Sequence, residues 1–104
     1  MNLKIYSQKI YSLAQKLFPI CRSLTGNGNR LTLKEIKKVV PELKIYEKKS
    51  GSKVFDWVIP KEWNIKDAYI LNEKNKKIID FKKNNLHVVS YSAPVNKRIS
   101  IQKL

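Results

Sequence analysis

The chain has 104 residues, 42% of them hydrophobic and 29% charged, which is typical of a globular domain and argues against disorder throughout. No apolar stretch approaches the roughly 20 residues of a membrane span, and the first residues are too polar for a signal peptide. A single cysteine, Cys21, excludes an internal disulfide framework and cannot build a zinc site alone. We therefore expect one small cytoplasmic domain, or part of one.

The net charge of +14, from 22 basic and 8 acidic residues, raises nucleic acid or another anionic polymer as a partner. Only Arg22, Arg30 and Arg98 are arginines, and the lysines are scattered along the chain. Base recognition favours arginine, and single-strand binding favours exposed aromatic side chains beside the charge. The aromatic residues here follow alternating patterns that predict burial. A solvated lysine-rich surface is therefore favoured, and a free-standing basic binding domain is the alternative.

A helix is predicted from Leu3 to Phe18, where apolar residues recur at three- and four-residue steps. Pro19 disfavours the helical conformation at the residue before it, so the helix should end or kink there. A basic amphipathic helix can lie on a membrane, but the polar face of this one is not densely cationic. The apolar stripe is therefore expected to face a core.

The loop that follows contains Gly26-Asn27-Gly28, which predicts backbone turning at positive φ. A glycine loop that opens a helix can bind an anion through its free N–H groups. Leu31 holds the place of the third glycine of a dinucleotide fingerprint, and the Gly-Lys-Ser/Thr end of a phosphate loop is missing. A simple turn between two helices is therefore favoured over an anion site.

A second helix is predicted from Leu31 to Val39, where Pro41 ends the pattern. Asn29 can cap its N-terminus, and Thr32 with Glu35 is an alternative capping box. Together with the first helix, it forms the predicted helical part of the chain.

The rest of the chain is predicted to be β-rich. Leu43–Glu47 and Lys53–Ile59 alternate like the two strands of a hairpin, with Phe55, Trp57 and Ile59 on the buried face and Pro60 ending the second strand. Further predicted elements are a strand pair Asp67–Leu71 and Lys77–Phe81, a last strand Leu86–Tyr91, and a short helix start at Ile99–Leu104. The predicted fold class is α+β, with two N-terminal helices followed by a small, mostly antiparallel β-sheet domain.

No set of residues specifies an enzyme. His87 is the single histidine and has no carboxylate at metal-ligand spacing, and Cys21 has no obvious base partner. Asp56 and Glu62 flank Pro60 and resemble an acid/base pair, but ion pairs with the abundant lysines explain them better. The residues alone therefore favour a structural or binding role.

Segments along nearly the whole chain carry a family resemblance: Leu17–Gly28, Ser50–Ile65, Asp67–Ile70, Ile79–Phe81, Asn85–Ser92 and Pro94–Asn96. They resemble the N-terminal part of bacterial aminopeptidase-like proteins, which are often encoded among polysaccharide-biosynthesis genes. The resemblance implies a zinc exopeptidase clan with a small inserted β-rich domain of unknown function and a C-terminal winged helix.

By this resemblance, residues 1–41 belong to the peptidase-like domain, 42–92 to the inserted β-rich domain, and 93–104 return toward the peptidase domain. The zinc ligands of such proteins lie downstream of Leu104, so no catalytic, cofactor or metal residue is carried over to this chain. The implied partner is the downstream peptidase domain or a homologous chain, and a homo-oligomer stays open. Nucleic acid and membrane are not expected partners.

The resemblance implies a non-catalytic N-terminal portion of an aminopeptidase-like protein, with a structural or cleft-gating role. Candidate cleft-lining residues come from the loop after the first helix and from the predicted last strand: Arg22, Ser23, Thr25, Asn27, His87 and Tyr91. Without the peptidase domain, the first helix has no packing partner, so we expect the isolated chain to be marginally stable.

Overall fold

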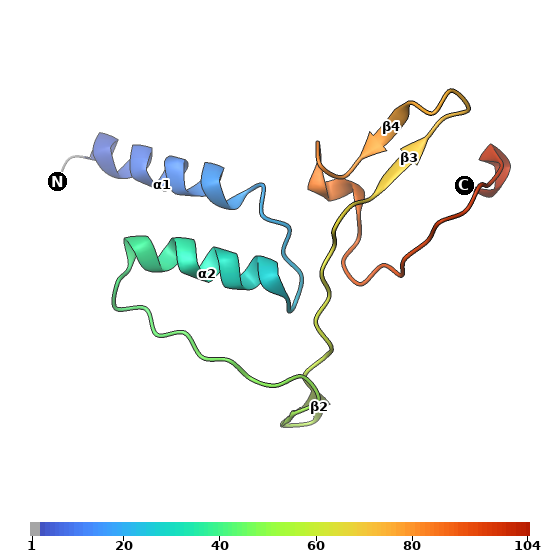
Figure 1. The fold of residues 1–104 in the computed structure, drawn as a ribbon. Coiled ribbons are helices and arrows are strands. Elements are labelled where there is room, and N and C mark those ends of the chain that lie inside the picture. The colour runs from blue at the N-terminus through green and yellow to red at the C-terminus, as the bar shows by residue number, and fades with distance from the viewer. Residues whose placement is uncertain (1–2) are drawn as a thin grey trace.

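The computed structural model describes residues 3–104, so Met1 and Asn2 of the predicted N-terminal segment lie outside the described residues. Two α-helices come first, α1 (Leu3–Leu17) and α2 (Asn27–Val39), and they run antiparallel (Figure 1). Two β-hairpins follow, β1 (Lys53–Val54) with β2 (Trp57–Val58) and β3 (Tyr69–Leu71) with β4 (Lys77–Asp80). The 3-10 helices η1 (Asn85–His87) and η2 (Ile101–Lys103) complete the described chain. The predicted α+β class is confirmed, with the strands divided between two separate sheets.

Helix α1 ends one residue before its predicted end. The amide of Phe18 still donates to the carbonyl of Ala14 at 2.9 Å, and Pro19 then stops the helical pattern. Leu13 and Leu17 are half-buried, whereas Tyr6 and Ile10 remain exposed. The predicted apolar stripe is therefore only partly covered by the described part of the chain.

Helix α2 begins four residues earlier than predicted, at Asn27, with Gly26 as its N-cap residue. The predicted caps are wrong. Asn29 instead donates its side-chain Nδ2 to the carbonyl of Ser23 at 2.9 Å, and Thr32 lies inside the helix. The early start depends on a residue from a distant segment, which is described with the candidate site.

The predicted pairing of Leu43–Glu47 with the next strand is wrong. Strand β1 turns back on itself through Phe55 and Asp56 and pairs with β2 in the register Lys53–Val58 and Val54–Trp57. The amide of Gly51 donates to the carbonyl of Ile59 at 2.8 Å, so this small hairpin closes on its own and leaves residues 43–47 extended and unpaired with it. Strand β2 ends before Pro60, as predicted.

The predicted burial of Phe55 and Trp57 is also wrong. Phe55 lies at the tip of the hairpin with 99% of its side chain exposed, and Trp57 is 52% exposed. Phe55 also has a φ of 54°, a left-handed conformation that costs a residue with a bulky side chain roughly 1–2 kcal/mol. The alternation indicates a strand face, but the described chain provides no core to cover it.

The predicted second hairpin is confirmed. Strands β3 and β4 pair antiparallel, with Tyr69 opposite Asp80 and Ile70 opposite Ile79. The side chain of Asn72 accepts the amides of Lys74 and Lys76 at 3.0 and 2.9 Å, which fixes the turn locally. Every determinant of this turn lies within a few residues of it, which explains why the sequence predicts it.

The predicted last strand, Leu86–Tyr91, is absent from the described residues. Asn84 instead caps the 3-10 helix η1 by accepting the amide of Leu86 at 3.0 Å, and a turn near Tyr91 follows. An asparagine cap therefore competes successfully with the β-propensity of Val88 and Val89. The short C-terminal helix is confirmed as η2, Ile101–Lys103.

The molecule is open rather than compact (Figure 1). Its radius of gyration is 18.5 Å, whereas a compact domain of this length has about 13 Å. Its accessible surface is 9779 Å², about 3,700 Å² more than a folded monomer of 12.2 kDa exposes. Within residues 3–104 no hydrophobic side chain is fully buried. The elements therefore form a scaffold without a core of its own.

Among the described residues, no helix combines the length and apolar character that crossing a bilayer requires.

Candidate functional site

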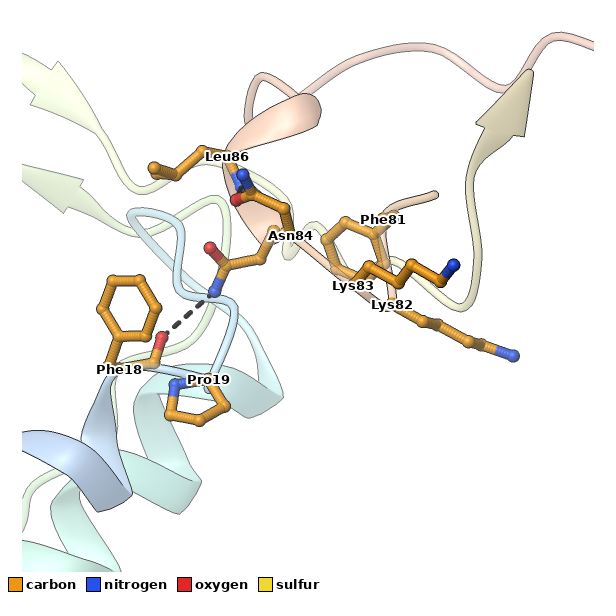
Figure 2. Close-up of a pocket in the computed structure, with 8 residues that line it drawn as sticks. Phe18, Pro19, Phe81, Lys82, Lys83, Asn84 and Leu86 are labelled. Atoms are coloured by element: carbon orange, nitrogen blue, oxygen red, sulfur yellow. Dashed lines mark hydrogen bonds between the residues drawn. The ribbon is translucent and has the colours of Figure 1, made fainter. Parts of the chain in front are cut away.

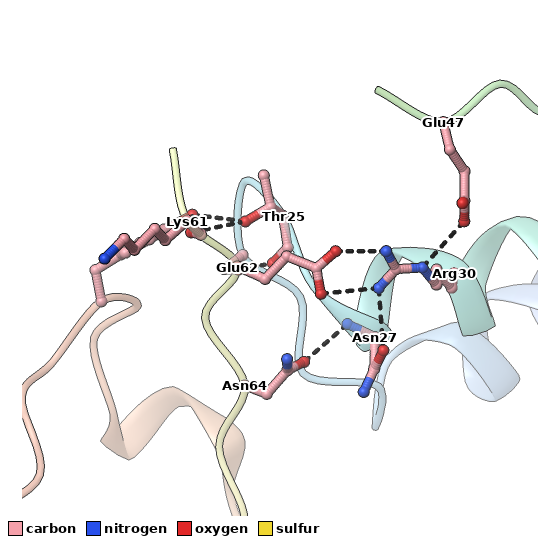
Figure 3. Close-up of polar contacts among 9 residues, drawn as sticks. Thr25, Asn27, Arg30, Glu47, Lys61, Glu62 and Asn64 are labelled. Atoms are coloured by element: carbon pink, nitrogen blue, oxygen red, sulfur yellow. Dashed lines mark hydrogen bonds and ion pairs between the residues drawn. The ribbon is translucent and has the colours of Figure 1, made fainter. Parts of the chain in front are cut away.

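Segments that are far apart in sequence meet at the start of α2. The loop of residues 21–26 leads into the helix, and the extended segment of residues 61–64 crosses it. The side-chain Oδ1 of Asn64 accepts the amide of Asn27 at 2.8 Å, although the two residues are 37 positions apart (Figure 3). Because this amide is one of the helix donors that has no partner within the helix, Asn64 acts as the cap that Gly26 lacks.

Two glycines allow this close crossing. A methyl group at Gly26 would lie 2.5 Å from the carbonyl oxygen of Trp63, and Gly26 has a φ of 118°, which favours glycine. A methyl group at Gly28 would lie 1.9 Å from the carbonyl oxygen of Cys21. Gly26 is the one fully buried residue within residues 3–104. The glycines therefore serve backbone packing, and the first free amide of α2 is occupied by a side chain of the protein.

A hydroxyl pair connects the loop to the C-terminal part of the chain. The hydroxyls of Thr25 and Tyr91 lie 2.8 Å apart, and each lies within hydrogen-bond distance of the carbonyl oxygen of Lys61, at 3.2 and 3.1 Å. Three segments far apart in sequence are thus joined at one backbone carbonyl. This arrangement fixes the three segments relative to one another, and its two hydroxyls do not form an acid/base pair.

The indole ring of Trp63 completes this junction. Its ring centroid lies 6.2 Å from that of Tyr91 with an interplanar angle of 29°, and its Nε1 donates to the carbonyl of Ser92 at 3.0 Å. Tyr91 has a φ of 64°, which is unfavourable for a bulky residue, but the stacking and the hydroxyl contacts offset it. We call Thr25, Asn27, Trp63, Asn64 and Tyr91 the loop junction.

An ion cluster around Arg30 flanks the loop junction. The guanidinium donates to both carboxylate oxygens of Glu62, one of them at 2.9 Å, to Glu47 at 3.2 Å and to the side chain of Asn27 at 3.1 Å (Figure 3). The two carboxylates, chiefly Glu62, raise the pKa of Arg30, and Arg30 holds the pKa of Glu62 below its usual range. The bidentate geometry orients segment 61–64 on α2.

The pH dependence of this cluster follows from the lowered pKa of Glu62, whose ordinary value is 4.5. Its contribution to stability is fully present above that value and is lost as pH falls through the lower folded-state pKa. We expect a carbon-detected NMR titration of the Glu62 carboxyl to show a midpoint below 4.5, and Arg30→Gln to raise this midpoint. Glu35, whose pKa is lowered mainly by Lys38, is the internal control and should not change. An unchanged Glu62 midpoint in Arg30→Gln would contradict the geometry.

Two cavities lie beside the loop junction. One, of about 530 Å³, is lined by a mixture of apolar and polar residues that includes Cys21, Thr25, Leu31, Trp63 and Phe81. The other, of about 590 Å³, lies between Phe18-Pro19 and residues 81–86, and the side chain of Asn85 bridges it by donating to the carbonyl of Phe18 at 3.1 Å (Figure 2). Both are surfaces between segments rather than enclosed chambers of a core.

The six residues singled out from the sequence divide into two groups. Ser23, Thr25, Asn27 and Tyr91 gather at or beside the loop junction, where the Ser23 hydroxyl donates to the carbonyl of Thr25. Arg22 instead donates to the carbonyl of Leu17 at 3.0 Å and to Thr32 at 3.3 Å, which ties α1 to α2.

His87 belongs to the second group and lies in η1, exposed, without a side-chain hydrogen bond to residues 3–104. Whether any of the six lines a cleft stays a prediction. Sequence reasoning did not single out Asn64, Arg30 or the Lys61 carbonyl. Most of their contacts join residues that are 30 or more positions apart in the chain. The local sequence therefore does not indicate that these residues lie near Gly26.

The side chains at this site hold backbone segments in position. Within the described residues, no three His, Cys, Asp or Glu side chains lie close enough together to hold a metal ion. The hydroxyls of Thr25 and Tyr91 are engaged with each other and with a carbonyl oxygen. The loop junction therefore holds its segments in place.

Comparisons with known proteins agree on one group. The chain is 62% identical over 96 residues to a protein of Clostridium acetobutylicum that is provisionally named a polysaccharide biosynthesis protein with an aminopeptidase-like domain. The match covers 92% of this chain and 22% of that protein. A crystal structure from the same organism, provisionally named a peptidase, matches with a TM-score of 0.88 and 61% identity, over 93% of this chain and 23% of the solved one.

The chain thus spans about a fifth of the length of the relatives it matches. The predicted resemblance to aminopeptidase-like proteins agrees with the names of both relatives. A family model described as "Domain of unknown function (DUF4910)" matches residues 11–100, which is most of the chain. The chain therefore belongs to the family described as a domain of unknown function, DUF4910.

Proposed function

We propose that this chain is a non-catalytic segment of an aminopeptidase-like protein, and that it works by packing against a larger peptidase-like body. The observation that carries this proposal is the open architecture. The chain exposes about 3,700 Å² more surface than a compact monomer of its size, and the same arrangement occurs within a solved chain about four times longer. A scaffold that lacks a core is the form expected of a segment whose apolar faces are covered by another part of a protein.

In this role residues 1–41 pack on the peptidase-like body, residues 42–92 form an inserted domain, and residues 93–104 return toward the body. The loop junction connects the first two of these parts, through Thr25 in the first and Trp63 and Tyr91 in the second. Rigid connection of this kind suits a wall or a gate beside a cleft. In this proposal the zinc ion, the peptidase reaction and the winged helix belong to the rest of the aminopeptidase-like protein. That protein acts in the cytoplasm.

The proposal is tested by exchanging segments. Residues 1–104 replace the matching segment of the Clostridium relative, and we call the product the exchange protein. We expect a soluble protein with a single cooperative thermal transition, because the body covers the exposed apolar faces. A matched control replaces the same segment with a flexible Gly/Ser linker of equal length and should lose that transition. An exchange protein that behaves like the linker control would contradict the proposal.

The net charge favours a second candidate, a free-standing domain that binds nucleic acid. If lysines neutralise phosphates, binding of the 104-residue chain to a fluorescent oligonucleotide must weaken steeply with added salt. We expect no binding at physiological ionic strength. Tight, salt-dependent binding together with an unfolded exchange protein would favour the second candidate.

A further inference from the structure

Phe55 combines two properties that are rarely found together. It occupies the left-handed region at a φ of 54°, where a bulky side chain is disfavoured, and its side chain is 99% exposed. A strained conformation persists when its surroundings determine it, and such residues concentrate at functional positions. Within residues 3–104, Phe55 has no contact that favours this conformation through its side chain.

The other non-glycine residues with positive φ provide the comparison. Asn75 has a φ of 56°, which asparagine tolerates in turns. Tyr91 is bulky, but its hydroxyl bonds Thr25 and the carbonyl of Lys61, and its ring stacks on Trp63. At Phe55 the two-residue turn between β1 and β2 sets the positive φ, because the favoured two-residue hairpin turns require it at the first loop position. The turn leaves the ring exposed, so any contact of this ring lies outside residues 3–104.

The hairpin that carries Phe55 is braced. The amide of Gly51 donates to Ile59, and the amide of Ile59 donates to Ser52 at 3.0 Å, behind the two rungs of β1 and β2. The hairpin also extends away from the helices and from β3 and β4 (Figure 1). A short, hydrogen-bonded hairpin therefore presents one aromatic ring at its tip.

The charge around the tip defines the chemistry of its partner. Residues 48–61 contain four lysines and one carboxylate, and all five side chains are exposed. Lys53 and Asp56 lie nearest the ring, whereas Lys48, Lys49 and Lys61 lie toward the base of the hairpin. A basic hairpin of this kind fits an apolar pocket whose rim carries carboxylates. A second copy of this chain, with its net charge of +14, opposes rather than complements that surface.

We propose that Phe55 is an anchor that inserts into an apolar pocket, rimmed by carboxylates, on the peptidase-like body. This inference rests on the proposed function and assigns one contact of that interface. The area also fits, because the surface in excess of a compact monomer is several times the roughly 800 Å² that each partner buries in a standard interface. Central aromatic anchors of this kind dominate the affinity of many interfaces.

The test uses Phe55→Asn in the exchange protein and in the 104-residue chain. Asparagine retains the left-handed backbone and removes the ring. We expect the thermal midpoint of the exchange protein to fall, and the chemical shifts of the isolated chain to change only near the hairpin tip. Tyr46→Asn is the matched control, because Tyr46 is also strongly exposed and has an ordinary φ. This control should leave the midpoint unchanged.

A photo-crosslinking phenylalanine at position 55 provides the second measurement. We expect it to link the hairpin of the exchange protein to a body peptide that contains apolar and acidic residues. An unchanged or higher midpoint for Phe55→Asn, or crosslinks confined to residues 1–104, would overturn the anchor while leaving the proposed function intact. A Phe55-dependent dimer or Phe55-dependent oligonucleotide binding of the 104-residue chain would assign the ring to another partner and also overturn it. An unfolded exchange protein with Phe55 intact would instead contradict the proposed function.

Discussion

Gly26→Ala should be among the most damaging single substitutions in the chain. A methyl group there would lie 2.5 Å from the carbonyl oxygen of Trp63 and 2.9 Å from the Oδ1 of Asn64, the group that caps α2. Overpacking against a backbone atom and a φ of 118° act together, so we expect a loss of about 3 kcal/mol in the free energy of unfolding of the exchange protein. Urea denaturation measures this loss, and faster hydrogen exchange of the Asn27 amide locates it.

Gly51→Ala is the matched control for this substitution. Gly51 also has a positive φ, of 85°, but a methyl group there would meet no atom within 4 Å. Only the backbone strain remains, so we expect a loss of about 1 kcal/mol. Equal losses for the two variants would show that the crossing of residues 63–64 over Gly26 contributes nothing.

Trp63→Ala should also produce a large effect. The indole stacks on Tyr91 and donates to the carbonyl of Ser92, so its removal leaves the strained Tyr91 backbone without its main compensation. Because Trp63 is half-buried, we expect a loss of about 2–3 kcal/mol, at or below the low end for a buried aromatic residue. Limited proteolysis after Tyr91 should accelerate in the exchange protein, since the segment that follows is released from the loop.

The other tryptophan supplies the control. Trp57 is 52% exposed on the first hairpin and takes no part in the loop junction. Trp57→Ala should leave proteolysis near Tyr91 unchanged. If Trp57→Ala released that segment as readily as Trp63→Ala, the junction described here would not be what holds it.

The parts of the fold that the sequence predicts are those determined locally. The β3–β4 hairpin depends on Asn72, which bonds amides two and four residues away, and the end of α1 depends on Pro19. The start of α2 was missed because its cap is Asn64, a residue 37 positions away. The last predicted strand failed for a local reason, because Asn84 caps a 3-10 turn where the β-branched residues favour extension.

The burial of Phe55 and Trp57 failed for a different reason. Period-two alternation indicates that one face of a strand is apolar, but it does not specify which molecule or segment covers that face. In the described chain nothing covers it. Thr25, Asn27 and Tyr91 were predicted through family resemblance to line a cleft, and that stays a prediction. Only the three-dimensional structure shows that these residues contact Lys61, Trp63 and Asn64.

Differential scanning calorimetry of the isolated 104-residue chain tests most directly whether this family member is a segment without a core. We expect a broad transition of small enthalpy, with a heat-capacity change well below the roughly 1.2–1.5 kcal/mol/K of a compact domain of about 100 residues. The exchange protein should instead show a sharp transition that includes the grafted segment. A sharp two-state transition of the isolated monomer, with the full heat-capacity change, would contradict this and would mean that the chain folds around a core of its own.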